Sequence, residues 1–348
     1  MTIEQLWLEL EAEASAGSTA TWSMRLASPN VGQPLLVALE KPAGIRSLLL
    51  PVPKKALPAR RDWPECRGLE LFMLAIEGQP HLGVRLRDPN CADVFTALAE
   101  DVSPRVVTAP DIRQAITALL DRLRHWQHFL AAGHDGLGPE AQRGLWGELH
   151  VLRAHLVPAL GPTAAVEGWK APAATNQDFQ FSTGSIEVKT TSAKQPQAVR
   201  ITSERQLDDT GTGTLLLHVV IVDEREVPPG GTAPGTSLPE MITALRAALA
   251  ENASAIDQFN DRLLETGWLD VQAQRYETRR WALRKELVFM VQPGFPRLVE
   301  SALPTGVGSV SYDLSLAACE PFATGIANAV ALLAEASNTP GQSSNQPE

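Results

Sequence analysis

One short stretch, residues 178–191, restricts the chain more than any other, because it combines the pattern of a β-hairpin with charged residues. Apolar and polar side chains alternate along it, which is the period of strands with two unlike faces. The apolar positions are Phe179, Phe181, Ile186 and Val188. Residues 182–185 have turn chemistry, with Gly184 expected to supply a positive φ. A four-residue loop there predicts that Phe179 opposes Val188 and Phe181 opposes Ile186.

The same pairing gathers charged side chains on the other face of the hairpin. Gln180 is then opposite Glu187, and Asp178 is opposite Lys189. Two neighbouring carboxylates repel each other unless positive charge lies between them. Lys189 could neutralise one carboxylate, whereas a divalent cation such as Mg²⁺, which prefers oxygen ligands, would neutralise both. The alternative interpretation is an exposed hairpin face with an ordinary Glu–Lys pair, because short motifs also occur by chance.

Length and composition predict a globular protein of the cytoplasm. The 348 residues correspond to about two domains, and 44% hydrophobic with 20% charged residues is ordinary for a chain with a core. The three cysteines lie far apart, which argues against a disulfide framework or a cysteine metal site. Neither a secretory signal nor an apolar run of membrane-spanning length is visible, so a soluble cytoplasmic protein with no membrane partner is expected.

Hydrophobic patterning predicts an α/β (α+β) protein with three structured regions. Residues 1–135 form an N-terminal α+β region, 136–225 a central core, 237–336 a C-terminal α+β region, and 337–348 a disordered tail. The N-terminal elements expected are helices at 2–14, 92–99 and 111–131, short strands within 19–50, and a hairpin at 69–76 and 82–86. The C-terminal elements expected are a helix capped at 237–240, a helix at 255–265, and strands at 281–291 and 307–316.

The central core begins with a helix at 139–156. Glu148 lies on the apolar stripe of this helix, and a carboxylate on an inward face is costly unless it is paired or bound to metal. A Glu at the edge of the stripe reaching solvent is the alternative. The elements expected after this helix are a short strand at 166–170, the hairpin, a strand at 199–201, a short helix at 203–207, and a doubly buried strand at 214–222.

This order of elements, with its charged residues, resembles the PD-(D/E)xK nuclease superfamily. The restriction-endonuclease-like core of that superfamily is αβββαβ, with an Asp on the second strand and Glu-x-Lys on the third. Asp178, Glu187 and Lys189 match that motif, whereas Gln177 departs from it, because a proline is expected before the aspartate. The residues that resemble the narrower family DUF4420 are 144–149, 178–179, 186–191, Arg122-x-x-x-Trp126, Gln206-Leu207 and 304–312.

The resemblance implies a Mg²⁺-dependent endonuclease that hydrolyses DNA, with Mn²⁺ as a substitute ion. Asp178, Glu187 and the backbone carbonyl of Val188 would bind the ion, and Glu148 would support it from the helix, directly or through water. Lys189 would orient or deprotonate the attacking water, or stabilise the charge of the transition state. Metal nearby would lower the pKa of this lysine.

The implied partners are DNA and, in a bacterial phage-defence or restriction-type system, ATPase or methyltransferase subunits, with a homodimer as a further possibility. Gln206 is the residue expected to orient the substrate. The net charge of −10 weighs against coating nucleic acid by bulk attraction, so DNA would need a local basic surface. The candidate groups are Lys54, Lys55, Arg60 and Arg61; Lys194, Arg200 and Arg205; and Arg275, Arg279, Arg280, Arg284 and Lys285 interleaved with Tyr276 and Trp281 for base stacking. A solvated face is the alternative for each group.

A second function remains open beside the nuclease. The net charge and the missing proline are compatible with a catalytically silent DNA-binding or scaffold subunit that keeps the nuclease fold.

Other kinds of catalytic or metal site are less well supported by the sequence. His125 and His128 are spaced to share a metal ion on a helix, but no third ligand is evident, so an interface or surface role is favoured. The sequence has no HExxH, P-loop or Gly-x-Ser-x-Gly motif.

Overall fold

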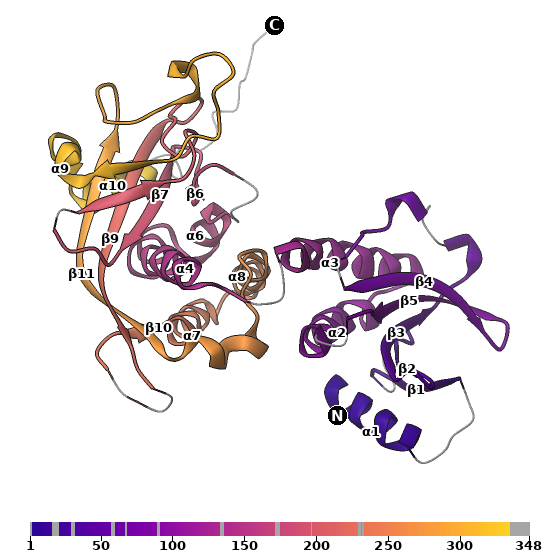
Figure 1. Ribbon diagram of the computed structural model, residues 1–348. Coiled ribbons are helices and arrows are strands. Elements are labelled where there is room, and N and C mark those ends of the chain that lie inside the picture. Colours follow the sequence, from indigo (N-terminus) through magenta and orange to yellow (C-terminus); the bar gives the residue numbers. More distant parts are fainter. Residues whose placement is uncertain are drawn as a thin grey trace, which may run out of the picture. The chain divides into compact units, whose positions relative to one another are not determined.

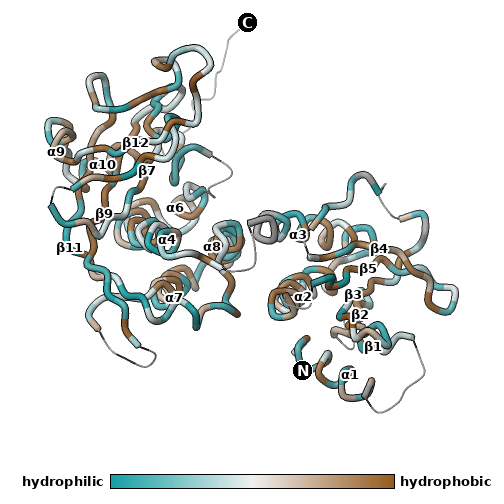
Figure 2. The backbone as a smooth tube through the Cα atoms, in the orientation of Figure 1, coloured by the Kyte–Doolittle hydropathy of each residue, from teal (hydrophilic) through white to brown (hydrophobic). Residues whose placement is uncertain are grey.

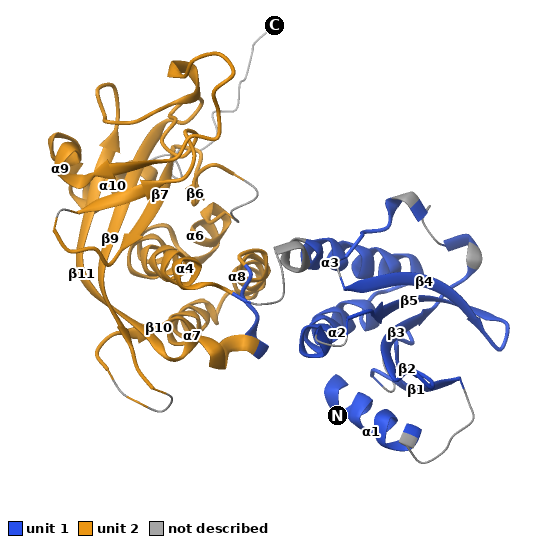
Figure 3. Ribbon diagram, viewed as in Figure 1, with its two compact units in different colours: residues 1–136, 267–271 blue, residues 137–266, 272–348 orange. Residues whose placement is uncertain are grey.

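The computed structural model describes residues 2–15, 21–28, 32–56, 60–66, 68–88, 91–132, 136–170, 175–195, 197–228, 231 and 233–334. The chain divides into two compact units, which are coloured separately in Figure 3. The N-terminal unit comprises residues 1–136 and 267–271, and the second unit comprises residues 137–266 and 272–348. Both mix helices with strands, which confirms the predicted α/β class. The predicted tail at 337–348 lies outside the described residues.

The N-terminal unit is built on a five-stranded antiparallel sheet with the order β1-β2-β3-β5-β4 (Figure 1). Its strands are β1 (Trp22–Leu26), β2 (Leu36–Glu40), β3 (Ile45–Pro51), β4 (Leu69–Ile76) and β5 (Gln79–Leu86). Its helices are α1 (Ile3–Ser15), α2 (Ala92–Val107) and α3 (Ile112–Ala132). The predicted helix at 92–99 is too short, because Val102 and Val106 continue the buried apolar stripe of α2.

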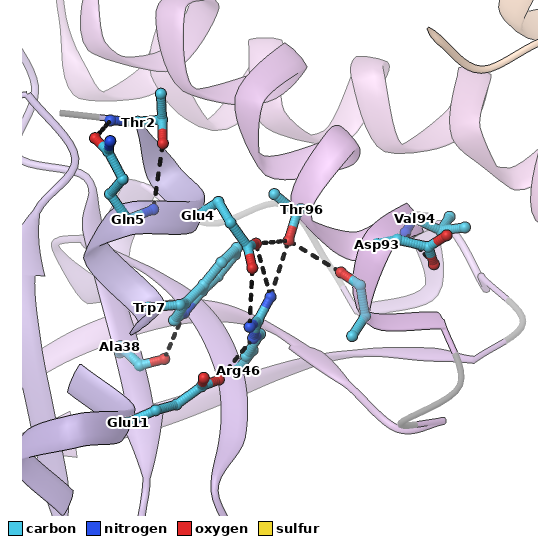
Figure 4. A network of polar contacts seen from close by, with 11 residues as sticks. Thr2, Glu4, Gln5, Trp7, Glu11, Ala38, Arg46, Asp93, Val94 and Thr96 are labelled. Carbon is cyan, nitrogen blue, oxygen red and sulfur yellow. Dashed lines mark hydrogen bonds and ion pairs between the residues drawn. The ribbon is translucent and has the colours of Figure 1, made fainter. Parts of the chain in front are cut away.

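Arg46 of β3 ties α1 to the rest of this unit (Figure 4). Its Nε lies 2.9 Å from Glu11 Oε1, and its Nη1 lies 2.9 Å from Glu4 Oε2. Nη1 also donates a hydrogen bond of 3.0 Å to Thr96 Oγ1 on α2, and the guanidinium lies 5.3 Å from the centre of the Trp7 ring. The Arg46 side chain is only 11% exposed, so these contacts replace the water it loses.

The Arg-x-x-x-Trp motif of α3 has a structural partner on α2. The indole Nε1 of Trp126 donates a hydrogen bond of 2.7 Å to Asp101 Oδ2, and the Arg122 guanidinium forms an ion pair with the same carboxylate. Arg122 and Trp126 are one helical turn apart, so both side chains point to the same neighbouring helix. The motif therefore fixes the packing of α3 against α2.

The second unit is built on a mixed sheet with the order β10-β11-β9-β7-β6, to which β13 adds beside β11. Its strands are β6 (Phe179–Gln180), β7 (Gly184–Thr191), β9 (Thr214–Glu226), β10 (Thr236–Ser237), β11 (Arg279–Val291) and β13 (Ala323–Thr324). β7 and β9 run parallel, and the other neighbours are antiparallel. A separate ladder pairs β8 (Ala198–Ile201) with β12 (Tyr312–Ser315).

Helices complete the second unit, and several lie beside the sheet in Figure 1. They are α4 (Pro139–Val151), a π-helical turn (Leu152–Leu156), α5 (Val157–Leu160), α6 (Pro162–Gly168), α7 (Leu238–Leu249), α8 (Ala253–Glu265), α9 (Leu316–Cys319) and α10 (Ile326–Ala334). Short 3₁₀ segments in the chain are Lys54–Ala56, Arg60–Asp62, Asp270–Tyr276, Glu300–Ala302 and Glu320–Phe322. Among the described residues, no helix is long and apolar enough to cross a bilayer.

β9 is the central strand of the second unit, and both of its faces are buried, as its apolar run predicts. Leu217 and Val219 pack on one face against Val199 of β8 and Leu314 of β12. The alternate residues, such as His218, point to the other face, where α4 and α10 lie. Apolar residues follow the central strands of both sheets in Figure 2. Packing on both faces holds β9 in place. β7 is positioned in turn because it pairs with β9.

Two predicted elements of the core are wrong. Residues 166–170 do not form a strand, because Gly161 and Pro162 start α6, and only Trp169 makes an isolated bridge to Phe179. Residues 203–207 do not form a helix but turns. In those turns the Glu204 carboxylate accepts hydrogen bonds from the backbone N–H groups of residues 309 and 310, so a side chain satisfies distant backbone instead of starting a helix.

The register of the central hairpin also differs from the prediction. Phe179 opposes Ile186, and Phe181 and Gly184 bond to each other through both backbone groups, so the loop has two residues instead of four. The shift is two residues, which leaves every side chain on its predicted face. Gly184 does not take a positive φ. It is needed because a Cβ there would lie 2.2 Å from the carbonyl oxygen of Thr214 on β9.

The Arg46 contacts generate a stability prediction. Arg46→Ala leaves two carboxylates and Thr96 without their shared cation, and we expect a loss of about 2 kcal/mol of unfolding free energy, less than for a fully buried pair because both glutamates are partly exposed. Arg25→Ala is the matched control, because Arg25 also pairs with a glutamate of α1 but is 44% exposed, and its loss should be about 0.5 kcal/mol. Urea unfolding with hydrogen exchange of α1 measures both, and equal losses would contradict the expectation.

Candidate active site

Four charged residues predicted from the sequence lie together in the second unit. Glu148 comes from α4, Asp178 directly precedes β6, and Glu187 and Lys189 come from β7. Their charges act on one another, since Glu148 and Glu187 both feel the charges of Asp178 and Lys189. These four residues are termed the carboxylate–lysine cluster. A helix, a chain segment entering a strand, and a neighbouring strand therefore meet at one place.

Asp178 is held at the edge of β7. Its Oδ2 accepts a hydrogen bond of 2.7 Å from the backbone N–H of Val188. In an extended strand the N–H and C=O of one residue point to the same side, so the Val188 carbonyl also faces the edge where Asp178 lies. β6 pairs only with Ser185 and Ile186, which leaves this part of β7 without β6 beside it. An aspartate and a backbone carbonyl are thus brought to one edge.

Glu187 and Lys189 share one face of β7. Lys189 Nζ lies 2.7 Å from Glu187 Oε1. The Glu187 side chain is 1% exposed, and neither of its oxygens has a hydrogen bond of normal geometry with a described residue, so Oε2 is a buried acceptor that the described part of the chain leaves unsatisfied. Such an oxygen costs free energy unless a cation or donor from outside the chain reaches it.

Burial and crowding raise the pKa values of all three carboxyl groups. Burial and, after it, the charge of Asp178 raise the pKa of Glu148 to about 8. Burial also raises the pKa of Asp178, although Lys189 and the Val188 N–H oppose it. Burial and the Asp178 charge raise the pKa of Glu187 well above its ordinary value. The raised pKa values favour the protonated forms, because one lysine cannot balance the charge of all three groups when they are ionised.

Lys189 keeps its positive charge among the three carboxyl groups of the cluster. Burial disfavours its ammonium form, but the carboxylates of Glu187, Asp178 and Glu148 outweigh burial and raise its pKa. We predicted that a metal ion would lower this pKa, whereas the carboxylates alone raise it. A lysine that holds its proton is suited to stabilise negative charge on a substrate.

Two residues outside the predicted set support the cluster. The indole Nε1 of Trp169 donates a hydrogen bond of 2.9 Å to Glu148 Oε2 and so fixes this carboxylate. Gln177 is 5% exposed, its Nε2 donates to the carbonyl of Arg205 at 3.0 Å, and its Oε1 accepts from Gln180. Gln177 thus anchors the segment before Asp178 to the 203–207 turns. Trp169 stands between Gly168 and Lys170 outside any motif, so the sequence did not single it out, whereas the departure from the expected proline drew attention to Gln177.

Gln206 lies in the same part of the second unit as Asp178 of the carboxylate–lysine cluster. A hollow of about 310 Å³ is lined by Asp178, Gln177, Lys170 and Gln206. The Gln206 side-chain oxygen accepts a hydrogen bond of 2.8 Å from the backbone N–H of Thr202, which orients the amide at the turn. The structure therefore brings Gln206 to the hollow that contains Asp178.

The cluster fits a hard divalent cation. The unsatisfied Glu187 oxygen, the Asp178 carboxylate and the Val188 carbonyl are oxygen donors, the kind that Mg²⁺ prefers. Three carboxylates and one ammonium leave two negative charges when all are ionised, which a divalent ion balances. Among the described residues, the three carboxylates do not all converge within 4.8 Å. Glu148 would support the ion directly or through water, as expected.

The basic groups proposed to bind DNA differ in their contacts. The suggested base stacking by Tyr276 and Trp281 is wrong, because both side chains are buried. Arg279 pairs with Glu224, and Arg280 pairs with Glu240. The described contacts of the other groups are Arg200 with Asp313, Arg205 with Glu300, Arg284 with Asp223, and Arg60 over the Trp63 ring. Lys55, Lys194 and Lys285 are exposed. The side chains of Lys54, Arg61 and His128 lie outside the described residues.

Comparison with known families agrees with this geometry. A family model matches residues 3–317, and it is DUF4420, described as "Putative PD-(D/E)XK family member". The match covers most of the 348 residues, so the chain belongs to this family. No curated protein and no solved structure matches the chain. The family description relates the chain to the PD-(D/E)xK nucleases. The carboxylate–lysine cluster lies within the matched residues.

The raised pKa of Glu148 predicts how stability depends on pH. Glu148 loses its proton at its ordinary pKa of 4.5 when unfolded but at about 8 when folded, so stability should fall as pH rises between these values. Glu148→Gln removes this group and should unfold at a higher temperature than the unchanged protein at pH 8, with a smaller difference near pH 5. Thermal unfolding in EDTA measures this. Glu226→Gln, at an exposed position of β9, is the control, and parallel pH curves for all three proteins would contradict the expectation.

Proposed function

We propose that this member of the DUF4420 family is a metal-dependent endonuclease that hydrolyses DNA phosphodiester bonds. The carboxylate–lysine cluster carries the proposal, because it combines buried oxygen donors with a lysine that keeps its charge. Burial of unbalanced carboxylates lowers stability, so it is expected where the charges serve chemistry. The DUF4420 match supports the same class of reaction.

The reaction needs a nucleophilic water and stabilisation of negative charge. The water oxygen forms a new bond to phosphorus, the bond between phosphorus and one deoxyribose oxygen breaks, and the leaving oxygen takes a proton. A divalent cation, Mg²⁺ or Mn²⁺, would supply Lewis-acid stabilisation and lower the pKa of water bound to it. Asp178, Glu187 and the Val188 carbonyl would hold this ion at the edge of β7.

Lys189 would stabilise the charge that develops on the phosphoryl oxygens. Its raised pKa favours this role over removal of a proton from water. Glu148, fixed by the Trp169 indole, would hydrogen-bond water in the site. Gln206 would orient the substrate from the hollow that it shares with Asp178.

DNA is the proposed substrate because exposed cations follow β7. Lys194 is exposed, and Arg205 lines a polar hollow of about 490 Å³ that also includes Gln177 and Ser185. These groups could contact phosphates despite the net charge of −10. A phage-defence or restriction-type setting, with ATPase or methyltransferase subunits or a second copy as partners, is part of the proposal through the family resemblance alone.

Plasmid cleavage tests the nuclease proposal. With Mg²⁺ the unchanged chain should cleave the plasmid, and EDTA should abolish cleavage. Asp178→Ala and Lys189→Ala should each reduce the rate on the order of 100-fold or more, because each removes a group that binds the ion or stabilises the transition state. Asp257→Ala, at an exposed position of α8, should cleave at the unchanged rate. Activity that survives both cluster substitutions would contradict the assignment.

The same proteins distinguish the alternative, a catalytically silent DNA-binding or scaffold subunit. Gln177 in place of proline and the acidic net charge favour that alternative. It predicts no cleavage with Mg²⁺ or Mn²⁺, and DNA binding that is independent of metal and unchanged in Asp178→Ala. A gel-shift measurement beside the cleavage assay decides between the two functions.

A further inference from the structure

A second group of metal-ligand side chains lies on the helix-facing side of β9 and takes no part in the proposed nuclease chemistry. His150 comes from α4, His155 from the π-helical turn, His218 from β9 and Glu286 from β11. These four residues are termed the histidine cluster. All are poorly exposed, with side chains between 5% and 19% accessible. Three parts of the chain that are distant in sequence, α4 with its π-helical continuation, β9 and β11, therefore place three imidazoles around one carboxylate.

The ring nitrogens converge on one oxygen atom. The Nε2 atoms of His150, His155 and His218 lie 3.2, 2.9 and 3.0 Å from Glu286 Oε1. Ligand atoms of His150, His155 and Glu286 all lie within 4.8 Å of one another. A tetrahedral zinc site has ligand bonds of about 2 Å, so an ion bound between these three ligand atoms would draw them closer together.

Hydrogen bonding alone does not satisfy the histidine cluster. A carboxylate oxygen offers two lone-pair directions, whereas three ring nitrogens point to Glu286 Oε1. In the described structure His150 Nε2 is buried and has no hydrogen bond of normal geometry. A metal ion would accept a lone pair from each imidazole and would leave none of these nitrogens unsatisfied.

The helix geometry around the cluster is specialised. Positions five apart on an α-helix point in different directions, about 140° apart, because each residue turns about 100°. The turn after α4 is π-helical, and the Val157 N–H bonds to the Leu152 carbonyl five residues earlier. His150 and His155 consequently approach each other, with ring centres 6.0 Å apart. π-Helical turns are rare and often occur at functional sites.

The charges also suit a cation. Burial lowers the pKa of His218, which favours the neutral form that binds metal. The three histidines outweigh burial and hold the pKa of Glu286 well below its usual range, so this carboxylate is ionised.

We propose that the histidine cluster binds a transition-metal ion, with Zn²⁺ as the chemically preferred ion. His150, His155 and Glu286 supply three ligands. His218 lies outside the set whose ligand atoms are mutually within 4.8 Å, but its Nε2 lies 3.0 Å from the same Glu286 oxygen, and it would supply the fourth by moving toward the ion. Imidazole-rich sites select Zn²⁺ and related ions, whereas Mg²⁺ requires oxygen ligands. With His218 as the fourth ligand the site would be saturated by protein ligands, so the role we propose is structural: the ion would join α4, which also carries Glu148, to β9 and β11.

Zinc content of the untagged full-length chain tests the proposal. After chelation and reloading with Zn²⁺, elemental analysis should find one ion per chain. Zn²⁺ should raise the melting temperature by about 5 °C or more when its free concentration is 100 times the dissociation constant. Reloading with Co²⁺ should give the visible absorption of a tetrahedral complex with nitrogen ligands. A chain that takes up no stoichiometric Zn²⁺ overturns the proposal.

Variants locate the ion. Glu286→Gln and His155→Gln should each weaken Zn²⁺ binding on the order of 100-fold or more. His125→Gln is the matched control, because it removes an imidazole from α3 outside the cluster, and it should keep full binding. Asp178→Ala should also keep one zinc ion, which separates this site from the carboxylate–lysine cluster. Binding that survives both cluster substitutions overturns the proposal, and the Co²⁺ spectrum of the unchanged chain remains decisive if a variant fails to fold.

Discussion

The structure of the second unit depends on how unbalanced negative charge is held at the edge of β7. Glu187 is removed from water with an oxygen that no group of the described protein satisfies, and one lysine opposes three carboxylates. Such an arrangement is stable only where the surrounding packing is rigid, because each carboxylate would otherwise move to solvent. The doubly buried strand β9 supplies that rigidity, and the Asp178 bond to the Val188 N–H and the Trp169 bond to Glu148 fix the remaining carboxylates.

Close packing around β7 explains details that are unrelated to its charges. A Cβ at Gly184 would collide with the Thr214 carbonyl, and one at Gly147 of α4 would lie 1.7 Å from the Thr190 hydroxyl. Small residues thus let both β9 and α4 approach β7 closely, and this approach brings Glu148 near the strand that carries Glu187. Gln177, which stands where the PD-(D/E)xK motif is expected to have proline, fixes the segment leading to Asp178 by hydrogen bonding. The departure from the motif therefore has a structural substitute.

α4 and its π-helical continuation connect two different kinds of ligand chemistry. Glu148 belongs to a group of oxygen donors suited to a hard ion, and His150, two residues later, belongs to a group of imidazoles suited to Zn²⁺. Because the two residues point in different directions around the helix, their sites stay separate. A metal ion in the histidine cluster would fix α4 against β9 and β11, and the orientation of Glu148 follows from that position.

The sequence by itself determined the α/β class, most helices and strands, and the residue types of the carboxylate–lysine cluster, because amphipathic periods and the Asp…Glu-x-Lys spacing are local properties. Tertiary structure decided the rest. The hairpin register depends on the contact of Gly184 with β9, and the 203–207 turns depend on Glu204 reaching residues 309 and 310. The histidine cluster joins residues up to 136 positions apart, from His150 to Glu286, and no local pattern marks it. Long-range packing alone brings such residues together, which is why their spacing in the sequence carries no signal.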